Sequence, residues 1–183
     1  KNVIYDSRKV EEGSLFICIR GAVVDGHKFV PDVVAKGAKV LIVEEAVEAP
    51  EDVTVILVKD TRYAMAFISA AYFGYPAEKL KTIGITGTKG KTTTTYMVKS
   101  ILENAGYKVG LIGTIEAIIG DKVIPAKNTT PESYVIQEYF HEMAEAGCDC
   151  VVMEVSSQGL MLHRTAGIMF DIGIFTNLGE DHI

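Results

Sequence analysis

The stretch KTIGITGTKGKTTTT, residues 81–95, decides the fold, because an apolar strand runs into a glycine-rich turn and then into a helical pattern. Gly87 and Gly90 bracket the turn. In such a turn, backbone N–H groups close on phosphate oxygens and the helix N-terminus adds the positive end of its dipole. Lys91 supplies a cation, and Thr92 places a hydroxyl where a Mg²⁺ ligand is expected. The stretch therefore predicts an ATP site.

The spacing of this turn differs from the standard phosphate-binding loop. The first glycine of that pattern would fall at position 85, which is Ile85, so the loop here is shorter. The alternative interpretation is a glycine-rich turn that carries a lysine by chance. The order of strand, loop and helix favours phosphate binding over that alternative.

Composition describes an ordinary globular protein with one large or two small domains. The chain has 183 residues, of which 48% are hydrophobic and 23% charged. A net charge of −6 argues against nucleic-acid binding. No apolar run approaches the roughly 20 residues that span a bilayer, and no signal peptide opens the chain, so we expect a cytoplasmic monomer without membrane partners. Three sparse cysteines predict buried thiols and no disulfide framework.

The first half of the chain alternates strands with helices, which predicts an α/β unit with a largely parallel sheet. The expected strands cover residues 14–19, 40–43 and 53–58, and the expected helices lie near 29–36 and over 61–73. Composition changes near Ala77, so we place the domain limits at 1–79 and 80–183. Beside the turn at Asp25, His27 is expected to be an exposed or capped histidine and not a ligand.

The second half continues with a helix after the turn, a strand over 109–112, and a hairpin around Gly120. Thr130 is predicted to cap a helix that begins near Pro131 and ends at Gly147. Its functional alternative is that loop hydroxyls and the helix N-terminus hold an anionic ligand.

An apolar strand over residues 150–155 carries the carboxylate of Glu154 near its end. A buried acid needs a partner, and beside a phosphate loop the expected partner is Mg²⁺, because ligands gather at the carboxyl ends of strands. The alternative is a salt bridge to a lysine. A further strand over 171–175 is followed by His182, whose imidazole could bind metal; spacing alone leaves its role open.

These motifs together resemble the Mur ligases, and within them the MurE type, over essentially all 183 residues. The resemblance implies a small N-terminal α/β domain that binds a UDP-sugar, followed by part of a P-loop-containing mononucleotide-binding α/β domain. The residues that carry it are Asp6-Ser7-Arg8, Gly13 to Phe16, Asp25-Gly26-His27, Gly87 to Thr93, Asn128 to Pro131, Glu154 to Ser157, Thr176 to Leu178 and Asp181-His182.

The resemblance further implies an ATP- and Mg²⁺-dependent ligase that adds an amino acid to UDP-N-acetylmuramoyl-L-alanyl-D-glutamate through an acyl phosphate, in peptidoglycan precursor synthesis. Lys91, Glu154 and His182 would be catalytic, and Thr92, Glu154 and His182 would hold metal. The ATP contacts would be Gly87, Thr88, Lys89, Gly90, Lys91, Thr92 and Thr93. The substrate contacts would be Tyr5, Ser7, Ala22, Val23, Val24, Asn128, Thr129, Thr130, Ser156 and Arg164.

The sequence departs from the family pattern at Gln158, Leu162 and Gly179-Glu180, which bears on how the sugar peptide is held and on the charge beside the metal site. Two rival hypotheses are a folylpolyglutamate-synthetase-like ligase and a non-catalytic binding module. A bridging lysine and an amino-acid-selecting domain, both implied by the family, are expected beyond Ile183. The 183 residues alone are therefore expected to be inactive.

Overall fold

The computed structural model of the protein describes residues 2–21 and 23–180. The chain forms two compact units, Lys1–Met65 and Ala66–Ile183, which divide within helix α2 (Thr61–Tyr72). The helix expected over residues 61–73 is thereby confirmed. The domain limits 1–79 and 80–183 stay a prediction.

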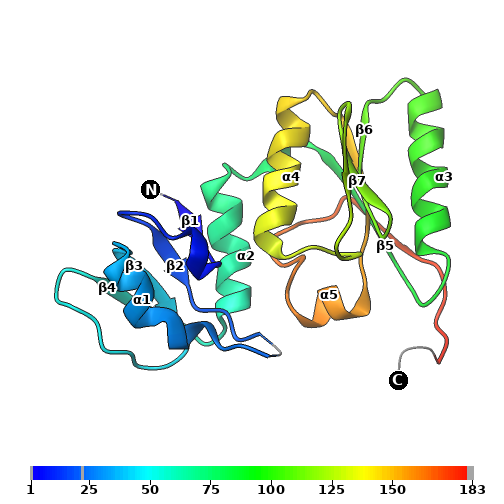
Figure 1. The fold of residues 1–183 in the computed structure, drawn as a ribbon. Helices are drawn as coiled ribbons and strands as arrows, with labels where there is room; N and C mark the ends of the chain where they lie inside the picture. Colours follow the sequence, from blue (N-terminus) through cyan, green and yellow to red (C-terminus); the bar gives the residue numbers. More distant parts are fainter. Residues whose placement is uncertain (1, 22, 181–183) are drawn as a thin grey trace. The chain divides into compact units, whose positions relative to one another are not determined.

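The first unit is built on a four-stranded sheet in the order β1-β2-β3-β4, and every neighbouring pair is parallel. The predicted parallel α/β unit is confirmed. Each strand is short, and the connections carry the helices (Figure 1). The elements are β1 (Val3–Ile4), η1 (Ser7–Lys9), β2 (Leu15–Ile17), η2 (Gly26–Phe29), α1 (Val30–Ala35), β3 (Val40–Val43) and β4 (Thr54–Leu57).

One side of this sheet carries the core of the first unit. Phe16 of β2 and Leu41 of β3 are almost fully buried, and they share a cluster with Val30 and Val33 of α1. The strand β4 differs, because all four of its residues are exposed. Helix α1 therefore covers the centre of the sheet, whereas the residues of the edge strand β4 are exposed.

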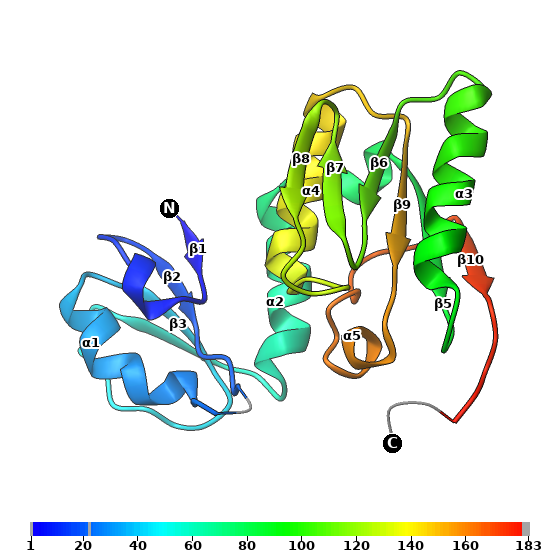
Figure 2. The same ribbon diagram turned by 45° about the vertical axis from the view of Figure 1, so that its right-hand side comes forward.

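The second unit contains a six-stranded sheet in the order β10-β5-β9-β6-β7-β8 (Figure 2). The neighbours β10, β5, β9 and β6 are parallel, whereas β6, β7 and β8 pair antiparallel, so the predicted hairpin is confirmed. The elements are η3 (Pro76–Lys79), β5 (Lys81–Thr86), α3 (Lys91–Asn104), β6 (Val109–Ile112), β7 (Glu116–Ile119), β8 (Lys122–Pro125), α4 (Ser133–Glu145), β9 (Cys150–Glu154), α5 (Ser157–Met161) and β10 (Ile172–Phe175).

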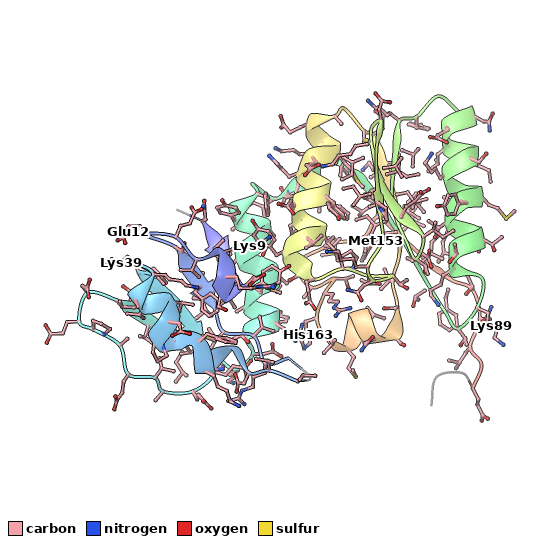
Figure 3. The ribbon with its side chains drawn as sticks, in the orientation of Figure 1. Lys9, Glu12, Lys39, Lys89, Met153 and His163 are labelled. Atoms are coloured by element: carbon pink, nitrogen blue, oxygen red, sulfur yellow. The ribbon has the colours of Figure 1, made fainter. Side chains whose placement is uncertain are left out.

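Helices α3 and α4 cover opposite faces of this sheet. Successive side chains of β9 point to opposite faces, so they pack alternately into two cores. Cys150 and Val152 pack in a cluster with Val98 and Leu102 of α3. Val151 and Met153 belong to a second cluster, whose α4 members are Ile136, Phe140 and Met143. Figure 3 shows Met153 inside the unit. Burial on both faces explains why the strand reads as a continuous apolar run.

The strand order places three chain segments at one edge of the sheet. Because β9 lies between β5 and β6, the carboxyl ends of all three parallel strands are neighbours. Ligands of open α/β sheets bind at such edges, where the strand order reverses. The loops after Thr86, Ile112 and Glu154 therefore meet at the place where a binding site is expected.

The prediction that Thr130 caps a helix is wrong. Helix α4 begins at Ser133, and its N-cap residue, Glu132, makes no side-chain capping bond. The Thr130 hydroxyl instead donates to Glu154 O at 2.9 Å and accepts from Ser156 N at 3.0 Å. These tertiary bonds tie the loop before α4 to the end of β9.

The three cysteines are free and buried, as predicted from their sparse spacing. Cys18 follows β2 in the first unit, and Cys150 begins β9 in the second. Within residues 2–21 and 23–180, no helix is both long and apolar enough to cross a membrane.

Candidate active site at the carboxyl edge of the second sheet

The phosphate loop, residues 87–90, leaves backbone donors open at the start of α3. Gly90 precedes the helix with a φ of +84°, which glycine adopts without strain, and no side chain caps the helix. Among the described residues, the N–H groups of residues 90–93 find no acceptor, and the first bond of the helix runs from Thr94 N to Gly90 O. Open N–H groups at the positive end of a helix dipole are suited to bind phosphate.

A second loop, residues 176–179, holds the phosphate loop in shape. The Asn177 amide accepts from Lys89 N at 3.0 Å and donates to Lys89 O at 2.9 Å, and Asn177 O accepts from Thr88 N at 2.9 Å. Thr176 Oγ1 also donates to Lys89 O, at 2.7 Å. The N–H groups of Thr88 and Lys89 are thus used within the protein, so the open donors lie further along, at residues 90–93.

The Lys91 ammonium lies across the phosphate loop. Its Nζ donates to Gly87 O at 2.7 Å and to Thr88 O at 3.2 Å, which places a positive charge over the loop. Figure 3 shows the neighbouring Lys89 at the start of α3. The structure thus brings the predicted cation and the open N–H groups together at one helix end.

The carboxylate of Glu154 is the buried centre of the site. Glu154 is the last residue of β9 and its exposed fraction is 0%. It accepts hydrogen bonds from Thr92 Oγ1 at 2.9 Å, from Thr114 N at 2.9 Å and from Thr114 Oγ1 at 3.0 Å. All three donors are neutral, and no described lysine, arginine or histidine pairs with this carboxylate. The alternative of a salt bridge to a lysine therefore finds no support in the described residues.

This environment fits a divalent cation. A buried carboxylate without a positive partner is costly, and a cation would remove that cost. Mg²⁺ prefers hard oxygen ligands, which the Glu154 carboxylate and the Thr92 hydroxyl offer side by side. His182, the third predicted metal ligand, lies outside the described residues.

A cavity of about 780 Å³ opens next to this carboxylate. All of the substrate contacts predicted for the second half of the chain line it, and so does Gln158, one of the departures from the family pattern. Its lining consists of Thr114, Lys127, Asn128, Thr129, Thr130, Ser156, Ser157, Gln158, Met161 and Arg164.

Two of the predicted substrate residues, Thr130 and Arg164, tie the loop before α4 to its surroundings. Thr130 is fully buried and uses its hydroxyl between Glu154 O and Ser156 N. The Arg164 guanidinium donates to Thr130 O at 3.0 Å and to Glu132 Oε1 at 2.8 Å. Arg164 thus braces the loop before α4, and its contact with substrate stays a prediction.

The substrate residues predicted in the first unit lie in its turns. Ser7 begins η1, and its carbonyl accepts from Lys36 Nζ at 2.9 Å. Val23 is 94% exposed, and Val24 O accepts from Gly21 N, which closes the turn. Ala22 lies outside the described residues. Tyr5 lies between β1 and η1, and its role stays a prediction.

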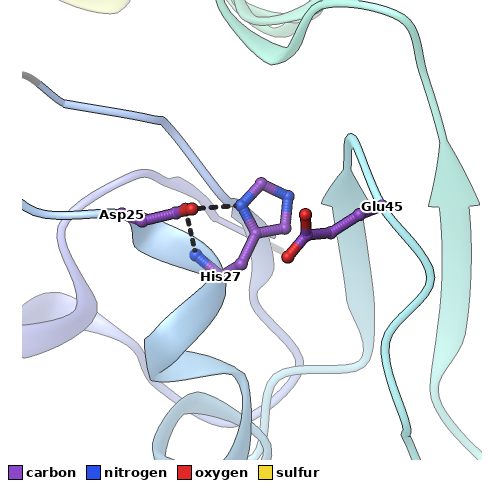
Figure 4. Close-up of side chains that lie close together, drawn as sticks. All are labelled: Asp25, His27 and Glu45. Carbon is purple, nitrogen blue, oxygen red and sulfur yellow. Dashed lines mark hydrogen bonds and ion pairs between the residues drawn. The ribbon is translucent and has the colours of Figure 1, made fainter.

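A cluster in the first unit has metal-ligand composition but is already satisfied (Figure 4). One ligand atom each from Asp25, His27 and Glu45 lies within 4.8 Å of the others. His27 Nε2 accepts from Glu44 N at 2.9 Å, so the ring proton resides on Nδ1 and is donated to Asp25 Oδ1 at 2.6 Å. Arg20 pairs with both Asp25 and Glu45. Both ring nitrogens make hydrogen bonds within the protein, and His27 is also buried. His27 is therefore a capped histidine, and the cluster has a structural role.

Sequence reasoning missed Thr114, the residue with two hydrogen bonds to Glu154. A signal was present, because Thr114 is a polar residue that closely follows the apolar strand over 109–112. The same reasoning that selected Glu154 from its place at a strand end applies to Thr114.

The fold and the site define a P-loop-like α/β protein, with a glycine-rich loop before a helix, a buried acid and a polar cavity along one sheet edge. The pattern described as "Mur ligase family, catalytic domain" matches residues 1–73, and the pattern described as "Mur ligase middle domain" matches residues 85–183. The chain belongs to the Mur ligase family. The resemblance inferred from its motifs is thereby confirmed.

Curated relatives place the chain within this family more closely. It is 55% identical to a protein of Clostridium perfringens and 53% identical to one of Clostridium acetobutylicum, over all of this chain in both cases. Both relatives are named UDP-N-acetylmuramoyl-L-alanyl-D-glutamate–2,6-diaminopimelate ligase. The chain spans 38% of the length of each.

Solved structures agree. A structure titled with the same ligase name superposes with a TM-score of 0.84 at 27% identity, over 100% of this chain and 37% of that one. A UDP-N-acetylmuramoylalanyl-D-glutamyl-2,6-diaminopimelate–D-alanyl-D-alanyl ligase from Acinetobacter baumannii gives a TM-score of 0.63 at 28% identity, over 100% and 37% of the two chains. The α/β fold predicted from the sequence is confirmed by these neighbours.

Proposed function

We propose that the chain is the nucleotide-binding part of an ATP-dependent ligase that adds 2,6-diaminopimelate to UDP-N-acetylmuramoyl-L-alanyl-D-glutamate in peptidoglycan synthesis. The amino acid follows the names of relatives that are 55% and 53% identical to this chain. One observation carries the chemistry: open N–H groups, a lysine and a buried carboxylate lie beside a polar cavity at neighbouring strand ends.

The reaction is a phosphoryl transfer followed by an acyl transfer. The bond between the γ-phosphorus and the bridging oxygen of ATP breaks, and a substrate carboxylate oxygen bonds to that phosphorus. The amine of the amino acid then attacks the acyl carbon, phosphate leaves with its bonding electron pair, and the amine loses a proton. Neither step requires a nucleophile from the protein; positioning and charge neutralisation supply the catalysis.

The residues of this chain have distinct tasks in that scheme. The N–H groups of residues 90–93 and the Lys91 ammonium would hold the ATP phosphates and neutralise developing charge. Glu154 and the Thr92 hydroxyl would hold Mg²⁺, which supplies Lewis-acid stabilisation of phosphoryl oxygens when bound.

Each unit carries residues that would bind substrate. The cavity residues Asn128, Thr129 and Ser156 would bind the muramoyl dipeptide. In the first unit, Ser7 and the exposed Val23 would bind its uridine end.

The test is an assay of the full-length protein with ATP, Mg²⁺, UDP-N-acetylmuramoyl-L-alanyl-D-glutamate and 2,6-diaminopimelate. We expect tripeptide product and phosphate in equal amounts, and no tripeptide when the amino acid is left out. Phosphate release without any amide product, over a panel of amino acids, would contradict the proposal.

A further inference from the structure

A continuous series of hydroxyl groups connects the cavity to the phosphate-loop helix through Glu154. Thr129 Oγ1 lies 3.0 Å from Thr114 Oγ1, and Thr114 Oγ1 donates to Glu154 Oε2 at 3.0 Å. On the other side, Thr92 Oγ1 donates to the same Oε2 at 2.9 Å. Thr129 and Thr114 line the cavity, whereas Thr92 belongs to the first turn of α3.

The carboxylate fixes the direction of every proton in this series. An ionised carboxylate only accepts, so Thr92 and Thr114 must each direct their single hydroxyl proton toward Glu154. Thr114 Oγ1 has then no proton left for Thr129, and Thr129 must be the donor between the two hydroxyls. The lone pairs of Thr92 and Thr129 consequently face outward. Thr92 presents an oxygen to a cation, and Thr129 presents an acceptor to a ligand in the cavity.

Thr114 is held in place by its backbone as well as its hydroxyl. Its N–H donates to Glu154 Oε1 at 2.9 Å, so one residue contacts both carboxylate oxygens. The preceding Gly113 permits this approach, because a Cβ there would lie 2.6 Å from Glu154 Oε1. The two residues after β6 can thus approach the Glu154 carboxylate at the end of β9 closely.

We propose that Thr114 is a positioning residue that couples the cavity to the phosphate loop, so that a ligand at Thr129 strengthens binding of Mg²⁺-ATP. This inference rests on the proposed function. The group that meets Thr129 is a hydrogen-bond donor, such as an amide N–H or a hydroxyl of the sugar peptide. By occupying the outward lone pair of Thr129, it holds the Thr129 hydroxyl on Thr114 and so steadies the arrangement that the carboxylate sets. The carboxylate and the Thr92 oxygen then stay oriented for the cation.

The test measures coupling between two ligands and requires no turnover. Calorimetry on the full-length protein gives the Kd of Mg²⁺ with a non-hydrolysable ATP analogue, with and without saturating UDP-N-acetylmuramoyl-L-alanyl-D-glutamate. In the wild type we expect the sugar peptide to tighten nucleotide binding at least about fivefold, the lower end of typical coupling. Thr114→Val keeps the shape but removes the hydroxyl, and should reduce this factor to about one. Thr114→Ser keeps the hydroxyl and should restore it.

A control variant removes a threonine hydroxyl elsewhere in the second unit, in strand β5. Thr82 in β5 bonds to Met169 O at 3.1 Å and to Asp171, and it has no bond to Glu154. Thr82→Val should therefore retain the coupling. Equal loss of coupling in Thr82→Val, or full coupling in Thr114→Val, overturns the role of Thr114.

The failures of the inference and of the proposed function are distinguishable. A wild type that binds both ligands without any coupling overturns the inference and leaves the proposed function intact. A wild type that binds neither ligand overturns the proposed function and the inference with it.

Discussion

The carboxylate group around Asp25 in the first unit and the single-carboxylate group of Glu154 in the second differ in the charge of their partners. In the first unit, Asp25 pairs with Arg20 and accepts two hydrogen bonds from His27. In the second unit, Glu154 is completely buried and accepts only from hydroxyl and amide donors of Thr92 and Thr114. By composition alone, the first group looks more like a metal site, because it combines a histidine with acids.

The difference shows that burial and the charge of the partners must be considered together. In the first unit, Arg20 gives one positive charge to Asp25, Glu44 and Glu45, and both histidine nitrogens are used. Asp25 and Glu45 are partly exposed, so water screens the rest of their charge and a cation would gain little there. Glu154 is buried with neutral hydrogen-bond donors only, and no described positive side chain pairs with it. A cation there would remove the cost of burying this carboxylate, which fits the proposed phosphoryl transfer.

The largest effect that this comparison predicts follows from removing the charge at Glu154. Glu154→Gln keeps the side-chain volume but loses the negative charge, so ligase turnover should fall by at least about 10²–10³-fold. Glu45→Gln, the matched change in the first unit, breaks a pair with Arg20 at an exposed position and should alter turnover by less than about twofold. A steady-state assay of both variants checks this. Equal losses of turnover in the two variants would show that the two groups do not differ in their role in the reaction.

The second effect follows from removing the Lys91 ammonium, which lies over the phosphate loop. Lys91→Ala should weaken ATP binding by about 10–100-fold, because a hydrogen bond to a charged group contributes about 1.5–3 kcal/mol. Lys99→Ala, on the same helix but paired with Glu103, serves as the control and should bind ATP normally. Calorimetry measures both values. Unchanged ATP affinity in Lys91→Ala would show that the phosphate loop is not part of the ATP site.

The smallest effect tests the structural role of the first group through pH. Hydrogen bonds from His27, first the backbone N–H and then the ring, hold the pKa of Asp25 below its usual value of 3.8, and Arg20 adds to this. Because the folded-state pKa is lowered, Asp25 stabilises the fold above pH 3.8, and this contribution is lost as pH falls through the folded-state pKa.

Urea unfolding of the wild type and of Asp25→Asn at pH 7 and near pH 3 measures that contribution. The wild type should be the more stable protein at pH 7, and the difference should shrink at the lower pH. A difference of the same size at both pH values would show that the Asp25 charge has no part in stability.

Much of the fold could be predicted because its strands are apolar runs bounded by glycines and polar residues. The strand β9 is buried on both faces and reads as a continuous run, and the hairpin around Gly120 carries its own turn signal. The two-residue strand β1 was missed, because two residues show no periodicity. Thr130 was misread as a helix cap, since local pattern contains no sign that its hydroxyl would bond to β9, 24 residues away.

The candidate site was predictable in part for the same reason. Lys91, Thr92 and Glu154 stand directly at the ends of strong local patterns, and the structure brings the last two into contact. The roles of Thr114 and Asn177 depend on which strands become neighbours. Thr114 meets Glu154 because β9 inserts between β5 and β6, and Asn177 meets the phosphate loop because β10 pairs with β5. Local periodicity does not encode that order.

The buried cysteines give the molecule a built-in chemical reporter of local opening. Burial raises the pKa of Cys18 to about 12, with the Asp25 charge adding to it, and burial also raises the pKa of Cys150. Only a thiolate reacts readily with alkylating reagents, so both thiols are inert while the protein is folded. Because Cys18 lies in the first unit and Cys150 in the second, the labelling rate of each thiol reports how often its own unit opens.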